Sequence, residues 1–120
     1  MDVSVDRKLL RVVGVHLGLL RSSRRGQLAA IRSHVEALDP LPTVILGDFN
    51  EWSDRTGLEP LVGFEVHSPG RSFHAARPVA SLDRIAVDDN LKLEDAGVVE
   101  SRDTRVASDH LPVWGKFRLE

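Results

Sequence analysis

The feature that most constrains the fold is a strand–helix–strand pattern in the first half of the sequence. Residues 8 to 17, KLLRVVGVHL, are rich in Leu and Val, which is typical of a strand buried on both faces. Residues 43 to 47, TVILG, have the same character. Between them, four apolar residues recur at helical spacing in residues 23 to 38: Leu28, Ile31, Val35 and Leu38. A strand, a helix and a strand in succession predict a βαβ unit with parallel strands.

Both ends of this helix are marked by residues with known local preferences. Ser22 or Ser23 is expected to cap the start, because a serine hydroxyl can accept a hydrogen bond from a free amide of the first turn. Asp39 and Pro40 are expected to end it, since the residue before a proline avoids helical angles. Ahead of the first long strand, the alternating DVSVD predicts a hairpin that turns at residues 6 and 7.

The second half of the sequence predicts shorter elements separated by Gly and Pro. A short helical segment is expected over residues 56 to 62. Short strands are expected over residues 64–67, 81–87, 92–98 and 111–119. Together with the first half, these segments predict an α/β fold in which a mixed sheet carries helices on one face.

The composition narrows the classes of function. A length of 120 residues fits one domain, and 42% hydrophobic residues suffice for a core. The net charge of -2 gives no general basic field, so binding of a long nucleic acid is not indicated, although a nucleic-acid substrate stays open. The lack of cysteine excludes disulfides, thiolate metal sites and cysteine nucleophiles.

The sequence favours a cytoplasmic protein. The lack of cysteine fits a reducing compartment. The first residues, MDVSVDRK, are charged and alternating, unlike the basic and then apolar start of a secretory signal. No apolar run approaches the length that a membrane-spanning helix needs. We therefore expect a cytoplasmic location and no transmembrane segment.

Polar side chains interrupt the apolar runs at four places, each at the end or the start of a predicted strand. The six residues concerned are His16, Asp48, Asn50, Asp83, Asp109 and His110. Taken singly, each has a structural explanation, such as a turn hydrogen bond or an ion pair of Asp83 with Arg84 or Arg105. Strand ends along one edge of an open α/β sheet converge on a ligand crevice, however, and this shared position predicts a single site.

The chemistry of this set is coherent. Carboxylate and amide oxygens without thiolates suit Mg²⁺, with Mn²⁺ as the alternative, rather than a structural zinc ion. A histidine beside an aspartate can act as a general base or stabilise a developing negative charge. Metal-assisted hydrolysis of a phosphate ester requires such a combination.

Four motifs in order resemble a known superfamily. They are HLGL at 16–19, GDFNEW at 47–52, SLDRIAV at 81–87 and SDHLPV at 108–113. Together they are similar to the C-terminal half of the endonuclease/exonuclease/phosphatase superfamily, the DNase I-like Mg²⁺-dependent phosphoesterases, and to its bacterial branch with HLGL and LDRI motifs. The resemblance implies half of a four-layer α/β sandwich and a hydrolase that acts on phosphate esters.

The resemblance also implies that residues 1 to 120 are a partial domain. In the superfamily, the N-terminal half supplies a glutamate that binds Mg²⁺, and no such segment precedes the HLGL motif here. Glu36 and Glu51 stand in the wrong context to replace it. One helix and a short helical segment can cover only one face of the predicted sheet, so we expect an uncovered apolar face through which the chain self-associates or aggregates. We also expect a weak metal site in the isolated chain.

Roles for the six residues follow from the resemblance. Asp48 is expected to orient or activate the attacking water and to contribute to the metal site. Asn50 is expected to contact the metal or the scissile phosphate, and Asp109 to bind or support the metal.

The two histidines of the set also receive roles. His110 is expected to stabilise the transition state or to act as a base, with Asp83 orienting its ring. His16 is expected to contact the phosphate. The three other histidines are interpreted as ordinary surface or packing residues: His34, His67 and His74.

The sequence does not distinguish between lipid-linked, sugar-linked and nucleic-acid-linked phosphate esters as the substrate. Arg84 stands where the DNA-repair members carry an aromatic residue, and the sequence has no tyrosine. This departure weakens an abasic-site nuclease and favours small phosphodiesters or phosphomonoesters. The cluster of Arg21, Arg24 and Arg25 offers a contact for an anionic group, but a solvated helix entrance is the favoured interpretation.

Two other interpretations compete with a phosphoesterase of this superfamily. The chain is alternatively a non-catalytic truncated fragment or binding module that retains the site residues. A calcineurin-like metallophosphatase would also use GD motifs, but it requires paired GNH and GHxH motifs, which the sequence lacks.

Overall fold

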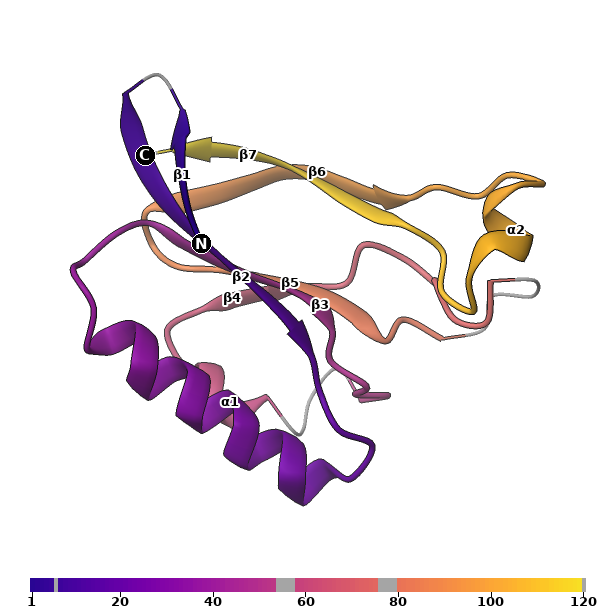
Figure 1. The fold of residues 1–120 in the computed structure, drawn as a ribbon, viewed down its shortest axis with the longest axis horizontal. Coiled ribbons are helices and arrows are strands. Elements are labelled where there is room, and N and C mark those ends of the chain that lie inside the picture. The colour runs from indigo at the N-terminus through magenta and orange to yellow at the C-terminus, as the bar shows by residue number, and fades with distance from the viewer. Residues whose placement is uncertain (6, 54–57, 76–79, 120) are drawn as a thin grey trace.

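The computed structural model describes residues 1–5, 7–53, 58–75 and 80–119. Figure 1 shows three layers: a helix, a central sheet and a two-stranded ribbon on the opposite side of the sheet from the helix. The strands are β1 (Asp2–Val5), β2 (Lys8–His16), β3 (Thr43–Asp48), β4 (Glu65–His67), β5 (Asp83–Val87), β6 (Leu91–Val98) and β7 (Val113–Leu119). The helices are α1 (Arg21–Glu36), the 3-10 turn η1 (Glu59–Leu61) and α2 (Thr104–Ala107).

The central sheet has the strand order β1-β2-β3-β5-β4 and is mixed. The predicted hairpin is confirmed, because β1 and β2 pair antiparallel. The predicted βαβ unit is also confirmed, since β2 and β3 pair parallel and α1 makes the crossover between them. Strand β5 runs antiparallel to both β3 and β4. The strands β2 and β3 therefore end at the same edge of the sheet.

Helix α1 packs its apolar stripe on one face of this sheet. Leu28 is fully buried there with Ile45 of β3 and Phe49, and Ile31 packs at the border of the same cluster. Burial of one such leucine stabilises a fold by about 1.5–3 kcal/mol. Leu28 and Ile31 of the predicted stripe thus fix the helix on the sheet. Leu38 lies beyond Glu36, where α1 ends, and is exposed, so its place in the stripe is wrong.

The start of α1 differs from the prediction. Leu20 stands at the N-cap position and no side chain caps the helix, so the capping role expected of Ser22 or Ser23 is wrong. The entrance is instead held by long side chains that reach other parts of the fold. Arg24 donates to the carbonyl oxygens of Gly18 and Leu19. These tertiary contacts replace a local cap.

The last two strands form their own sheet, which corrects the single mixed sheet predicted from the sequence. Strands β6 and β7 pair antiparallel as a ribbon that lies across the second face of the central sheet. Phe117 and Leu119 of β7 pack there against a buried cluster that includes Ile85 of β5. Gly115 permits the close approach, because a Cβ atom at this position would lie 3.0 Å from the Cδ1 atom of Ile85.

The sequence predicted that one apolar face of the sheet would be uncovered, and the ribbon bears on this prediction. The chain's own C-terminal strands cover the second face of the sheet over Val44 of β3 and over Ile85 and Val87 of β5. Self-association stays a prediction, and light scattering with size-exclusion chromatography would measure it.

Smaller differences concern the short elements. The helical segment expected over residues 56 to 62 is the 3-10 turn Glu59–Leu61, and residues 56 and 57 lie outside the described part of the chain. Helix α2 was not predicted. None of the helices in the described ranges combines the length and the apolar character needed to cross a membrane.

Candidate active site

Three polar side chains stand in one row across neighbouring strands. His16 at the end of β2 is in register with Asp48 at the end of β3, and Asp48 is in register with Asp83 at the start of β5. Residues in register on adjacent strands point to the same face of a sheet. The fold therefore brings together residues that are distant in the sequence.

His110, which precedes β7, joins this row from the ribbon layer. Its Nδ1 atom lies 2.9 Å from the Oδ2 atom of Asp83, and its Nε2 atom lies 3.3 Å from the Oδ2 atom of Asp48. The ligand atoms of these three residues all lie within 4.8 Å of one another. His16 completes the group, with its Nε2 atom 3.5 Å from the Oδ2 atom of Asp48 and its side chain 80% exposed.

Asp83 is buried and is held by a second partner. The hydroxyl group of Ser72 donates a hydrogen bond to its Oδ2 atom, the same atom that faces His110. The ion pair of Asp83 with Arg84 or Arg105, considered from the sequence, does not explain its position. Arg84 donates to the carbonyl oxygen of Glu51, and Arg105 pairs with Glu100. Asp83 is thus placed to orient the ring of His110.

The neighbouring carboxylates shift the pKa of His110. Burial of its ring acts to lower the pKa, but the hydrogen bond that the ring makes to Asp83 and the charges of Asp83, Asp48 and Asp109 together raise the pKa of His110 above its ordinary value. When the ring is charged, both nitrogens are donors. When it is neutral with the proton on Nδ1 toward Asp83, Nε2 is an acceptor. The geometry serves either of the two roles expected of His110.

The GDFN segment has backbone roles beside any chemical one. Gly47 has a φ of +137°, and a Cβ atom there would lie 2.1 Å from the carbonyl oxygen of Val15, so only glycine fits. Asn50 adopts a left-handed φ of +49°, its backbone N–H donates to Oδ1 of Asp48 at 2.8 Å, and its Nδ2 donates to the carbonyl oxygen of Leu17 at 2.6 Å. The two oxygens of Asp48 are therefore divided, one toward the loop and one toward His110.

Asp109 stands apart from the cluster. Its side chain is exposed, with Oδ1 3.4 Å from the hydroxyl oxygen of Ser108. Its carbonyl oxygen accepts a hydrogen bond from the backbone of Ala75. The structure thus brings His16, Asp48, Asp83 and His110 together with Asn50 adjoining, and it leaves Asp109 close enough to His110 to act through its charge.

Two neighbours of the cluster were missed by the reasoning from sequence. Ser72 binds Asp83, and Phe73 forms a backbone bridge to His110 with its ring centroid 5.1 Å from that of His110. Both lie in an irregular segment, where no periodicity marks a side chain as inward-facing. In the sequence they stand in the segment GRSF at 70–73, which also resembles the bacterial branch of the superfamily but does not indicate where either side chain points.

Glu51 forms a second charged cluster directly beside the site. Its side chain is only 1% exposed and accepts two hydrogen bonds of 2.8 Å from Arg21, and Arg24 approaches it at 3.3 Å. The hydrogen bonds from Arg21 outweigh the effect of burial and lower the pKa of Glu51 to about 2. With Arg25 paired to Glu59, this arginine cluster has the contacts of a helix entrance. Glu51 is therefore committed to the arginines and not to a metal.

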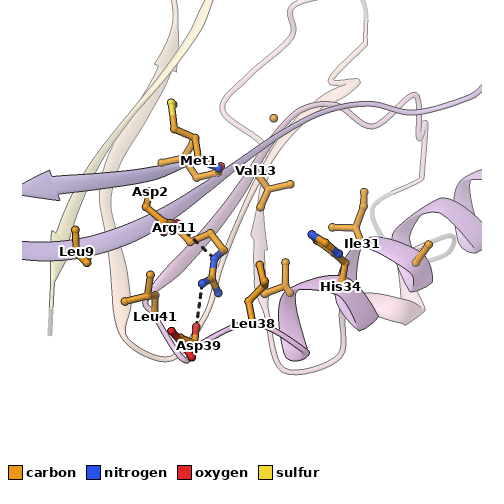
Figure 2. A pocket seen from close by; sticks show the side chains of 14 residues that line it. Met1, Asp2, Leu9, Arg11, Val13, Ile31, His34, Leu38, Asp39 and Leu41 are labelled. Atoms are coloured by element: carbon orange, nitrogen blue, oxygen red, sulfur yellow. Dashed lines mark hydrogen bonds and ion pairs between the residues drawn. The ribbon is translucent and has the colours of Figure 1, made fainter.

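A hollow with a volume of about 910 Å³ lies at the other end of the strands. Figure 2 shows it between the hairpin and the C-terminal half of α1. Arg11 crosses it and donates to the carbonyl oxygen of Asp39, and its Nε atom lies 3.6 Å from Asp2. None of the residues that line it belongs to the site described above.

By sequence, no protein-family model matches the chain, but curated proteins do. The chain is 32% identical over 121 residues to the uncharacterised protein YbhP of Escherichia coli K12, and the alignment covers 93% of this chain and 47% of YbhP. The chain thus spans about half the length of the curated relatives that it matches.

Solved structures share the fold. A functionally unknown protein from Enterococcus faecalis V583 matches with a TM-score of 0.77 and 23% identity, over 94% of this chain and 50% of that one. An endonuclease/exonuclease/phosphatase from Bacteroides vulgatus matches with 0.73 and 20%, over 96% and 51%. The Bacteroides thetaiotaomicron mannosyl-6-phosphatase matches with 0.72 and 18%, over 93% and 51%.

These matches define the class of fold. The chain has the fold of the solved endonuclease/exonuclease/phosphatase structures that it matches. It covers about half of each of these chains, so the fold implied by the resemblance is confirmed.

Proposed function

We propose that this chain is the half of a divalent-metal-dependent phosphoesterase that carries its catalytic histidine. The reaction is hydrolysis of a phosphomonoester or phosphodiester by attack of water. The observation that carries the proposal is the position of His110, whose two ring nitrogens face Asp83 and Asp48. In this proposal residues 1 to 120 form a partial domain, and the remaining half supplies the further carboxylate that the metal requires.

The protein groups divide the work as follows. Asp83, fixed by Ser72, holds the ring of His110 in one orientation. His110 then directs Nε2 toward the reacting phosphate, where a charged ring stabilises the negative charge of the transition state and a neutral ring takes a proton from water. His16, exposed at the rim, contacts the phosphate.

The donor set fits a hard divalent cation. The cluster offers carboxylate oxygens and an imidazole without thiolates, and its ligand atoms lie close enough together to share one ion. Within this cluster we assign Asp48 to hold Mg²⁺, or alternatively Mn²⁺. Asn50 and Asp109 are the further proposed ligands, and the Asp109 side chain, which lies outside the cluster, would have to turn toward the ion. When bound, the ion would polarise a phosphoryl oxygen and acidify a water molecule. Asp48 would orient the attacking water.

The test is turnover of bis(4-nitrophenyl) phosphate and 4-nitrophenyl phosphate with Mg²⁺ or Mn²⁺. Two preparations are compared: the chain alone, and the chain fused to the half of E. coli YbhP that it does not match. Asp48→Asn should lower turnover on the order of 100-fold or more. Asp89→Asn is the matched control, because Asp89 is an exposed carboxylate outside the cluster.

The outcomes separate the two classes of function. Metal-dependent turnover that Asp48→Asn abolishes and Asp89→Asn leaves intact supports the phosphoesterase. Turnover no higher than that of Asp48→Asn in both preparations would contradict it and would favour a non-catalytic fragment or binding module.

A further inference from the structure

Trp52 is an exposed aromatic residue next to a backbone that is held by hydrogen bonds. Its side chain is 65% exposed, although the preceding residue, Glu51, is fully buried. The backbone is held on both sides, because the Glu51 carbonyl oxygen accepts a hydrogen bond from Arg84 at 2.9 Å and the Glu51 side chain accepts one from the Ser53 amide at 3.1 Å. The ring is therefore presented outward by a fixed loop.

A row of rings connects Trp52 to the proposed catalytic histidine. The rings of Trp52 and Phe73 meet edge to face, with centroids 6.3 Å apart and an interplanar angle of 86°. Phe73 in turn packs on the ring of His110 and is bridged to it through the backbone. Trp52 thus stands two ring contacts from the atom proposed to face the phosphate.

Exposure alone would not distinguish Trp52, since single exposed apolar side chains are common and Leu19 is also exposed. The other tryptophan makes the useful contrast. Trp114 is 43% exposed, but its ring lies over Gly97, where a Cβ atom would approach it to 2.9 Å. Trp114 therefore packs on the ribbon, whereas Trp52 keeps most of its ring surface open beside the site.

We propose that Trp52 determines substrate class by stacking on a ring in the group esterified to the phosphate. This inference rests on the proposed phosphoesterase function. An aromatic face binds the flat face of another ring, either an aromatic ring or a sugar ring, and such stacking on a nucleobase tightens binding by about 5- to 150-fold. With the phosphate at His110, a ring on the adjoining atoms would extend along Phe73 to Trp52. Phe73 acts as the positioning residue that holds the Trp52 ring.

The test measures binding separately from turnover. Isothermal titration in Mg²⁺ compares phenyl phosphate, glucose 1-phosphate and ethyl phosphate, which carry an aromatic ring, a sugar ring and no ring. At least one ring ester should bind about tenfold more tightly than ethyl phosphate. Trp52→Leu should remove this difference, and Trp114→Phe, the matched control, should keep it. Because the chain has two tryptophans, Trp114→Phe also leaves Trp52 as the sole fluorophore, and the ring ester should change its emission.

Each outcome decides the inference. Equal binding of all three phosphates, or a ring preference that survives Trp52→Leu, would overturn it even if the chain hydrolyses phosphate esters. Absence of binding by all three phosphates, in the chain and in its fusion to the YbhP half, would also overturn it. A Trp52-dependent ring preference without turnover would support the stacking site while the proposed catalytic function fails. If turnover is present, Trp52→Leu should raise KM for the ring ester more than KM for ethyl phosphate, and Trp114→Phe should not.

Discussion

Two charged clusters lie side by side at the end of β3, and they are built on opposite principles. Around Glu51, one buried carboxylate is matched by the guanidinium groups of Arg21 and Arg24. Around His110, one titratable ring faces two carboxylates and stands near a third. The first cluster is compensated, with Glu51 and Arg24 buried, while among the described residues the second has more carboxylates than cationic side chains. A compensated cluster suits a structural role, and an excess of carboxylates suits the binding of a cation or a reaction.

The largest expected effect comes from removing the centre of the cluster around His110. In the preparation that turns over, His110→Ala should lower kcat about 100- to 1,000-fold, because its contact is proposed to act on the transition state. Its unfolding free energy should change by less than that of a Glu51 variant. Steady-state kinetics and Mg²⁺ titration measure the two effects. Loss of Mg²⁺ affinity with kcat preserved at saturating metal would contradict this role.

Breaking the cluster around Glu51 should instead lower the free energy of unfolding. Glu51→Gln keeps the shape of the side chain but leaves Arg24 buried without its charged partner, so the unfolding free energy should fall by about 3 kcal/mol. Urea denaturation measures the loss. The matched control is Glu36→Gln, which breaks an exposed pair with Arg32 on the same helix and should cost about 0.5 kcal/mol or less. Equal losses in the two variants would show that burial of Glu51 adds nothing.

The same cluster predicts a pH dependence of stability. The pKa of Glu51 is about 2 in the folded chain and 4.5 without its surroundings, so the carboxylate stabilises the fold. This contribution, roughly 1–3 kcal/mol, is complete above pH 4.5 and is lost as the pH falls through 2. The difference in unfolding free energy between the wild type and Glu51→Gln should therefore shrink between pH 5 and pH 2. A difference that grows over this range would reverse the assigned sign.

The smallest effect concerns the ribbon that carries His110 into the site. Gly115→Ala would bring a methyl group to 3.0 Å from Ile85 and should cost about 1–3 kcal/mol. Gly14→Ala is the control, since nothing lies within 4 Å of a Cβ atom there. Thermal unfolding compares the two. If Gly115→Ala were neutral, the close approach of the ribbon to the sheet would not be tightly packed.

Local patterns were sufficient to predict the hairpin, the βαβ unit and the packing of Leu28 and Ile31 of α1. They were insufficient for the ribbon, because the alternation of Val113, Gly115 and Phe117 shows that one face is buried but not which sheet the strand joins. The start of α1 was missed for a related reason. Arg24 reaches two carbonyl oxygens in the preceding loop, and such a tertiary contact has no signature at the serines of the first turn.

The residues of the candidate site likewise fall into those that could be predicted from the sequence and those that could not. His16, Asp48 and Asp83 were predictable because their strands set their register, and His110 because it precedes a strand. Side chains from irregular segments were not predictable, since Ser72 reaches Asp83 through the path of a loop. Asp109 is adjacent to His110 in sequence, yet its side chain lies outside the cluster, because neighbouring residues at a turn need not share a direction.

The position of the ribbon in the chain bears on biosynthesis. Strand β7 and His110 follow every other part of the site in the order of translation, yet they cover the sheet formed by the earlier elements. A nascent chain can pair β2 with β3 before β7 has been made, and its sheet then exposes the face around Ile85 to other chains. Docking of the ribbon covers this face and delivers His110 in one event. The arrival of His110 at Asp48 and Asp83 is therefore coupled to the covering of this apolar face.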